Sequence, residues 1–201
     1  ALLANSCGQP VKIHLDRDTD QIITGKRHKC FSQYRIGFND DGKIEALDLD
    51  LHLDAGSSTD LTMAILERAM FHLDNAYYIP SLRVNGHTWK TNYPSNTAFR
   101  GFGGPQGMAV IENIIDRIAR FLKMDALDVR KVNFYGETAN NTTHYGQLVE
   151  SNRLPLLYPQ LTGSSRYFAR RKVIDAFNRE NEFVKKGLAL TPVKFGISFT
   201  T

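Results

Sequence analysis

Long apolar runs are missing from this 201-residue sequence. No stretch approaches the roughly 18 consecutive apolar residues that a membrane-spanning helix requires, so we expect no membrane partner. The first ten residues, ALLANSCGQP, lack the basic start and the long apolar centre of a signal peptide. Hydrophobic residues still form 42% of the chain, which is ample for a buried core. The sequence therefore predicts a soluble, cytoplasmic protein.

Cysteine is also scarce, because Cys7 and Cys30 are the only two and lie far apart. Neither has the CxxC or Cys/His spacing of a metal site, and no two histidines have the HxxxH or HxH spacing. We therefore expect no metal held by protein ligands. The two cysteines are interpreted as reduced core residues rather than as a disulfide.

The chain has only a small excess of positive charge, with a net charge of +4 at pH 7. Acidic residues are interspersed among the basic ones, and no aromatic residues alternate with them. This pattern favours solvated faces over a nucleic-acid-binding stripe.

Complete catalytic motifs are missing too, because there is no GxSxG, no Cys/His pair and no obvious carboxylate dyad. The chain therefore has no self-sufficient catalytic group.

The spacing of apolar residues predicts an α+β fold of mixed sheets packed with helices, because strands and helices follow one another without a regular βαβ rhythm. We expect strands at residues 11–15, 30–38, 43–55, 82–90 and 188–199. We expect helices at residues 61–73, 106–122, 125–134 and 164–183, the end of another helix before residue 8, and a polar turn at 16–20.

We also predict the positions of several polar residues within these elements. Asp60 and Asp125 are expected to cap the helices that follow them. Asp48, Asp50 and Asp54 alternate with leucines on one strand, and we interpret them as its solvated face, because such a row does not close a coordination shell. The helix at 106–122 is expected to expose Glu112, Asp116 and Arg120, and to bury Met108, Ile111, Ile115, Ile118 and Leu122.

The segment at residues 136–160 is rich in Asn, Thr, Gly and Pro, and we interpret it as a connection between domains. We predict that residues 1–136 form the C-terminal part of a first domain. Residues 137–163 are predicted to be the connecting segment, and residues 164–201 the start of a second domain. Both ends resemble interrupted secondary structure, so we expect a fragment of a longer protein.

Residues 92–108, NYPSNTAFRGFGGPQGM, are the most informative part of the chain. Gly101 and Gly103 allow the backbone to adopt positive φ and to approach a ligand closely. Pro105 suits the first turn of a helix, whose free N–H groups favour an anion. Together with Arg100 and Phe102, the pattern predicts a site for a planar, partly anionic ligand. A tight strand-to-helix turn with an exposed Arg100 is equally compatible with the spacing alone.

Arg68 lies in an otherwise apolar helical segment and allows two interpretations. Its side chain reaches the surface or pairs with Glu67 or Asp60. Alternatively, a buried guanidinium binds a carbonyl group or an anion in a pocket. The spacing by itself favours the first interpretation.

The segment SNTAFRGFGGPQG at residues 95–107 resembles the signature of the xanthine dehydrogenase/xanthine oxidase family, in its large molybdenum-cofactor-binding region. The segments LERAMFHLDNAY from Leu66 and YFARRKVIDAFNREN from Tyr167 fall in the family's order and spacing. The resemblance covers essentially the whole chain. It implies a central fragment of the molybdenum-cofactor-binding subunit, with parts of two adjoining molybdopterin-binding domains.

The resemblance implies roles for three residues. Arg100 contacts the molybdopterin cofactor, chiefly through its backbone, and Phe102 lies against the aromatic ring of the substrate. Arg68 reaches the purine, where it acts catalytically by stabilising the negative charge that develops as the ring is attacked. Arg68 also favours a xanthine or hypoxanthine hydroxylase, because the aldehyde oxidases, the sister group, generally lack an arginine there.

The resemblance further implies an oligomeric enzyme that oxidises hypoxanthine and xanthine toward urate. Molybdenum–molybdopterin carries the redox chemistry, and electrons leave through 2Fe-2S clusters and FAD in other domains or subunits. The family's general-base glutamate falls outside this chain, so we expect the fragment to be inactive by itself. An aldehyde oxidase-type hydroxylase and a non-catalytic packing module stay open as alternatives.

Overall fold

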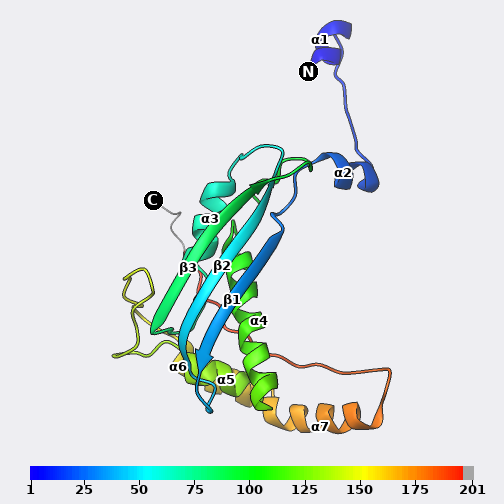
Figure 1. Ribbon diagram of the computed structural model, residues 1–201. Helices are drawn as coiled ribbons and strands as arrows, with labels where there is room; N and C mark the ends of the chain where they lie inside the picture. Colours follow the sequence, from blue (N-terminus) through cyan, green and yellow to red (C-terminus); the bar gives the residue numbers. More distant parts are fainter. Residues whose placement is uncertain (197–201) are drawn as a thin grey trace.

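The computed structural model describes residues 1–196 and combines helices with three strands (Figure 1). The elements are α1 (Leu2–Cys7), α2 (Arg17–Ile23), β1 (Cys30–Phe38), β2 (Ile44–Gly56), α3 (Thr62–Phe71), β3 (Ser81–Lys90), α4 (Gly104–Leu122), α5 (Ala126–Asn133), α6 (Leu154–Ser164) and α7 (Tyr167–Glu180). This combination confirms the predicted α+β class. None of the helices formed by residues 1–196 has the length and apolar character needed to cross a bilayer.

The strands form one mixed sheet in the order β1-β2-β3. β1 and β2 pair antiparallel as the predicted hairpin, whereas β2 and β3 pair in parallel with α3 between them in the chain. The helices α3 and α4 cover one face of this sheet, behind it in Figure 1. The other face carries no helix within the described residues.

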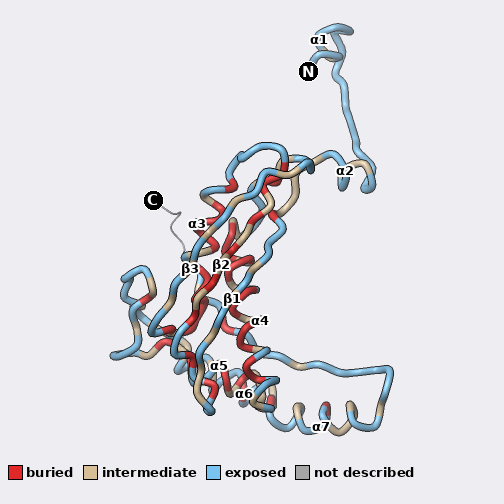
Figure 2. Tube along the Cα trace, in the orientation of Figure 1, coloured by how far each residue is buried: buried red, intermediate tan, exposed pale blue. Residues whose placement is uncertain are grey.

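The core lies between the sheet and these two helices, where Figure 2 shows the buried positions concentrated. The alternating leucines of β2 at 47, 49, 51 and 53 are all buried, which confirms the period-two interpretation. The acidic residues between them are only partly buried and face away from the helices. Asp48 pairs there with Arg35 (2.7 Å) and Arg83 (2.6 Å), so the solvated-face interpretation is confirmed as well.

The amphipathic pattern of α4 is confirmed for its central isoleucines. On the polar side, Glu112 is an exception. Ile111, Ile115 and Ile118 are buried, and so is Ile114. Met108 and Leu122, which were also expected in the core, are only partly buried. Glu112 does not face solvent, because its carboxylate accepts from Arg130 Nε of α5 at 2.8 Å. The ion pair draws this carboxylate into the α4–α5 contact.

The N-terminal part of the chain corrects two expectations. Residues 11–15 form no strand, and Figure 1 shows this segment extending away from the sheet, where no neighbouring strand can pair with it. Residues 16–20 are not a turn but the start of α2. Asp16 accepts the Thr19 N–H at 2.7 Å, and this cap turns the polar segment into a helix start. The expected helix end before Gly8 is confirmed, with φ of 61° at that glycine.

Two further expectations need correction, and one is confirmed. Asp60 does not cap α3: it has φ of 43°, and Leu61 occupies the N-cap position without a side-chain cap. Asp125 does cap α5, accepting the Leu127 N–H at 2.8 Å. Cys7 and Cys30 are free, as expected, but both are exposed rather than part of the core.

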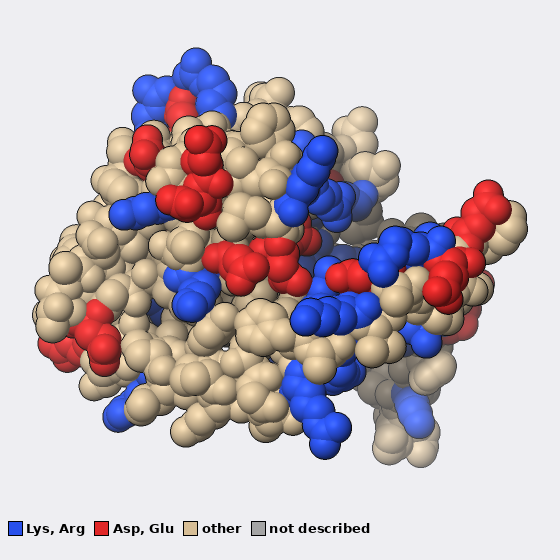
Figure 3. Space-filling view, turned by 90° about the horizontal axis from the view of Figure 1, so that it is seen from below, with Lys and Arg blue, Asp and Glu red and all other residues tan. Residues whose placement is uncertain are grey.

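The C-terminal third contains one helix that the sequence analysis took for a connecting segment. Helix α6 begins with Pro155 in its first turn, a position where a missing N–H is harmless, and includes several leucines. Residues 188–196 form no strand, and residues 197–199 of the expected strand lie outside the described range. The lower face of the molecule, with α7, carries acidic and basic side chains side by side (Figure 3). No stripe of one sign is visible there.

Two glycines allow α4 to lie directly on the backbone of α3. A Cβ atom on Gly107 would lie 2.2 Å from the Ala69 carbonyl oxygen, and one on Gly103 would lie 2.1 Å from the Ile65 carbonyl oxygen. Both distances are far below van der Waals contact. The sequence at the start of α4 therefore sets how closely the two helices approach.

We expect Gly107→Ala to destabilise the protein by about 1–3 kcal/mol, because the added methyl forces the helices apart. Gly107 is helical and has no positive φ, so backbone strain does not contribute. The matched control is Gly163→Ala in α6, where no atom lies within 4 Å of the added Cβ. This control should be neutral or stabilising by up to about 1 kcal/mol. Chemical denaturation measures both, and equal effects would contradict the close-contact argument.

Candidate functional site

The glycine-rich loop has the irregular backbone that its sequence predicts. Gly101 and Gly103 have φ of 93° and 94°, and Phe102 between them has φ of 43°. The turn is held by the Phe102 N–H, which donates to the Phe99 carbonyl at 2.8 Å, and by the Gly104 N–H, which donates to the Gly101 carbonyl at 2.9 Å. Phe102 is partly buried and packs against the core. The loop therefore brings an aromatic side chain and the start of α4 to the same place.

Arg100 lies on the exposed part of this loop. Its carbonyl oxygen accepts a hydrogen bond from Arg27 Nη2 at 2.6 Å. The N–H groups of Arg100 and Gly101 make no hydrogen bond to any of residues 1–196. Exposed backbone donors beside two arginines suit an anionic group that offers several acceptor oxygens. This donor set fits the pterin cofactor that the resemblance implies.

Arg68 is buried, with 3% of its surface exposed, so the interpretation that its side chain reaches the surface is wrong. Its Nη2 donates to the Gly196 carbonyl at 2.8 Å, and its guanidinium lies 4.9 Å from the centre of the Phe195 ring. The second interpretation, a buried guanidinium that meets a carbonyl, describes what the structure shows. The source of that carbonyl, a segment 128 residues further along the chain, was not predicted.

His72 adds a second contact to the same segment and was missed by the sequence analysis. Its Nε2 accepts the Gly196 N–H at 3.1 Å, so the proton of the neutral ring is on Nδ1, which donates to the Arg68 carbonyl at 2.8 Å. Burial lowers the pKa of His72 below its ordinary value of 6.5. The spacing of four residues between Arg68 and His72 places both on one face of α3, which is the only sequence signal for this pair.

Asn75 and Asp74, just after α3, continue this attachment. Asn75 Nδ2 donates to the Pro192 carbonyl at 2.9 Å, and Asn75 Oδ1 accepts the Lys194 N–H at 3.1 Å. The buried carboxylate of Asp74 accepts from Lys194 Nζ at 2.7 Å and from the Tyr135 hydroxyl. Residues 192–196 are therefore held by side chains of one helix and its end, in place of a strand partner.

Phe195 links the two predicted parts of the site. It lies beside Arg68, and a Cβ on Gly104 would come within 2.6 Å of its ring. The structure thus brings Arg68 and the start of α4 together around one aromatic ring. The Arg100 side chain has no such contact within the described residues. A cavity of about 560 Å³ opens next to Phe195, and its walls include His72, Thr143, Tyr145, Lys194 and Gly196.

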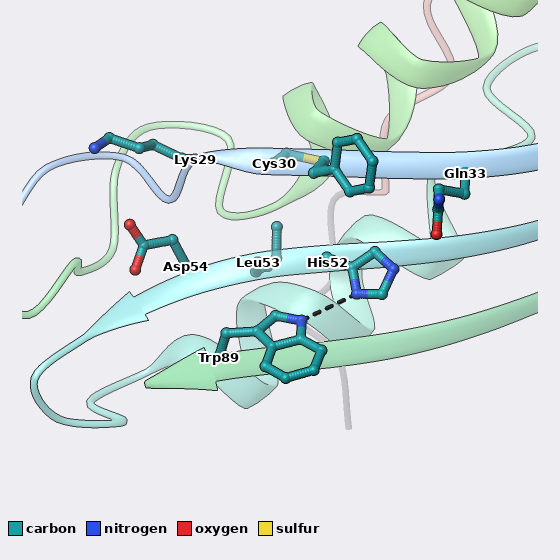
Figure 4. Close-up of a pocket in the computed structure, with 8 residues that line it drawn as sticks. Lys29, Cys30, Gln33, His52, Leu53, Asp54 and Trp89 are labelled. Atoms are coloured by element: carbon teal, nitrogen blue, oxygen red, sulfur yellow. Dashed lines mark hydrogen bonds between the residues drawn. The ribbon is translucent and has the colours of Figure 1, made fainter. Parts of the chain in front are cut away.

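A second cavity lies on the open face of the sheet (Figure 4). It has a volume of about 410 Å³ and is lined by Lys29, Phe31, His52 and Trp89, among others. Trp89 Nε1 donates to His52 Nδ1 at 3.0 Å. Across residues 1–196 no group of three or more His, Cys, Asp or Glu side chains is arranged to hold a metal ion. The side chains of Phe31, His52 and Trp89 give this depression a largely aromatic wall.

The chain matches the molybdopterin cofactor-binding domain family over residues 1–134, and it belongs to that family. Its relatives include xanthine dehydrogenase from Oryza sativa subsp. japonica, 49% identical over 96% of this chain and 14% of that protein. Xanthine dehydrogenase/oxidase from Rattus norvegicus is 46% identical over 100% of this chain and 15% of that protein. These matches confirm the predicted resemblance, and the chain spans only about 14–15% of the length of these relatives.

Solved structures agree with the fold. The aldehyde oxidoreductase from Desulfovibrio gigas superposes with a TM-score of 0.73 and 30% identity, over 91% of this chain and 19% of that one. Quinoline 2-oxidoreductase from Pseudomonas putida 86 has a TM-score of 0.72 with 21% identity, over 89% of this chain and 23% of that one. The second likeness concerns the fold alone.

Acid is expected to weaken the attachment of residues 192–196, because protonated His72 cannot accept the Gly196 N–H. A histidine whose folded pKa is lowered contributes stability that is complete above its unfolded pKa and is lost as the pH falls through its folded pKa. The window therefore begins near the ordinary value of 6.5 and extends below it. Within this pH window, the free energy of unfolding falls by on the order of 1.4 kcal/mol per pH unit.

The control is His72→Phe, which keeps a ring and removes both hydrogen bonds. Buried His28, whose pKa burial also lowers, is present in both proteins, so its contribution cancels in the difference. The difference in Tm between the parent protein and this variant should shrink as the pH falls from about 8 to about 5. A constant difference would show that protonation of His72 has no influence on stability.

Proposed function

We propose that this chain forms one wall of the active site of a molybdenum hydroxylase of the xanthine dehydrogenase type, which oxidises hypoxanthine and xanthine toward urate. In this proposal Arg68 and Phe102 contact the purine, and Arg100 contacts the molybdopterin. The observation that carries the proposal is a buried guanidinium, Arg68, held in a fixed position beside the glycine loop.

In this proposal the chain contributes to the chemistry through the positive charge of Arg68. Attack on a purine ring carbon places negative charge on the ring, and a cation fixed in an apolar environment stabilises that charge without reorganising. The hydrogen bond to Gly196 and the ring of Phe195 fix the guanidinium before substrate arrives. Phe102, partly buried on the neighbouring loop, offers a flat apolar face on which a purine stacks.

The cofactor contact is proposed for the exposed backbone of the glycine loop. The N–H groups of Arg100 and Gly101, which have no partner among residues 1–196, would bind acceptor oxygens of the pterin. When bound, the molybdenum–pterin group supplies the two-electron oxidation chemistry. The residues of this chain bind, orient and provide charge.

The rest of the enzyme is proposed to lie outside these residues. The general base, the 2Fe-2S clusters and the FAD would belong to other domains or subunits of a cytosolic, oligomeric enzyme, so this chain alone would be inactive. We also propose that the chain joins two molybdopterin-binding domains, with the connection at residues 137–163. Residues 192–196 would then carry the second domain onto α3 of the first.

In the complete enzyme, Arg68→Met should lower kcat/KM for xanthine by on the order of a hundredfold, or about 3 kcal/mol, because the developing charge loses its partner. Turnover of small aldehydes should change far less. Steady-state kinetics with both substrates, normalised to molybdenum content, measure the ratio.

Arg130→Met is the matched control, since Arg130 is equally buried but pairs with Glu112 and Asp116 and makes neither of the contacts that Arg68 makes with Phe195 and Gly196. It should cost stability and leave the ratio of xanthine to aldehyde turnover unchanged. If Arg68→Met left xanthine kcat/KM intact, Arg68 would have no part in purine oxidation. A parent enzyme that oxidised aldehydes but not xanthine would support the aldehyde oxidase-type alternative. A parent protein without molybdopterin would support the packing module.

A further inference from the structure

Arg27 lies between a strand and the glycine loop, and its guanidinium makes two contacts with that loop. Nη2 donates to the Arg100 carbonyl at 2.6 Å, and the guanidinium lies 4.6 Å from the centre of the Phe99 ring. A planar guanidinium can donate a hydrogen bond in its plane and place its flat face over an aromatic ring, whereas an ammonium has no such flat face. The two contacts therefore define the orientation of the loop in two directions.

The backbone on either side of Arg27 is anchored, which makes its side chain a fixed support. The Lys26 carbonyl accepts the Thr97 N–H at 3.1 Å. On the other side, Nε2 of buried His28 is hydrogen-bonded to Thr62 Oγ1 at 2.8 Å. Arg27 thus projects from a segment attached both to the stretch before the loop and to the start of α3.

The planarity of the peptide bond transmits this support to the next residue. In a trans peptide the carbonyl oxygen of one residue and the N–H of the following residue point in opposite directions in one plane. Fixing the Arg100 carbonyl toward Arg27 therefore directs the Gly101 N–H away from Arg27. A glycine with φ of 93° has broad conformational freedom, so this peptide plane needs an external constraint.

We propose that Arg27 is a positioning residue that fixes the Arg100–Gly101 peptide and so aims the Gly101 N–H at the cofactor. The cofactor part of this inference rests on the proposed function above, whereas the constraint on the loop does not. The bound group would be an anion or a polar heterocycle that offers an acceptor atom to that N–H. Arg27 acts on it through the loop and does not need to touch it.

The first measurement is hydrogen exchange of the Phe102 and Gly104 amides, whose hydrogen bonds close the loop. In the purified complete protein, Arg27→Gln should accelerate exchange at both amides by on the order of tenfold, which corresponds to about 1.4 kcal/mol of loop stability. Arg35→Gln is the control with the same change of charge. Arg35 is exposed and pairs with Asp48, which keeps Arg83 as a partner.

The second measurement is the rate at which bound molybdopterin dissociates, followed as molybdenum retained per protein after dialysis. Arg27→Gln and Arg27→Lys should both lose the cofactor on the order of tenfold faster than the Arg35→Gln control. Lysine keeps the charge but lacks the planar group that donates to the carbonyl in its plane while its face lies over the Phe99 ring. Retention by Arg27→Lys equal to that of the parent protein would mean that charge alone matters, and would overturn the positioning role.

The two measurements separate the possible failures. Unchanged exchange at Phe102 and Gly104 in Arg27→Gln would overturn the constraint on the loop, whatever the cofactor does. A parent protein that carries no molybdopterin would overturn the proposed function, and with it the aim of the Gly101 N–H at a cofactor. The exchange experiment would still decide in that case whether Arg27 fixes the loop.

Discussion

The close contact between α3 and the start of α4 is the constraint on which the rest of the site depends. Gly103 and Gly107 let α4 approach until the carbonyl oxygens of Ile65 and Ala69 lie where side chains would otherwise stand. Arg68 lies on the same stretch of α3, so the helix contact sets the distance between this arginine and the glycine loop. The sheet beneath supplies a rigid platform, because the leucines of β2 pack against both helices. The two glycines at the contact between α3 and α4 thus determine where Arg68 lies relative to the glycine loop.

Much of the fold could be predicted from the sequence where periodicity and turn chemistry agree. The alternation in β2, the isoleucines of α4 and the cap by Asp125 all followed from local patterns. The errors fall where local patterns are overridden or compete. Residues 11–15 are apolar enough for a strand but have no partner, and Asp16 can open a helix as readily as a turn. A strand requires a neighbour, and the presence of a neighbour is not a local property.

The candidate site was predictable in its loop and only partly in its surroundings. Glycine and proline spacing indicated the irregular backbone, and the family resemblance drew attention to Arg68. The sequence did not reveal that Phe195 lies against Arg68, because 127 residues separate them and no periodicity links them. The same holds for Arg27, which a sequence reader places among scattered surface charges. Contacts of this kind arise from the tertiary fold, and only the folded chain displays them.

The attachment of residues 192–196 has a consequence for how this region can change over evolutionary time. Side chains of Arg68, His72 and Asn75 bind main-chain atoms of that segment. Two of the segment's own side chains also take part, because Lys194 pairs with Asp74 and Phe195 lies against Arg68, whereas the side chain of Val193 is exposed. Main-chain atoms are the same in every residue except for the missing N–H of proline. Substitutions should therefore accumulate freely at Val193, while the position of the segment stays the same. The sequence constraint falls on α3 and the residues just after it, as well as on Lys194 and Phe195, so much of the recognisable signature of this junction is expected on the helix that holds the segment.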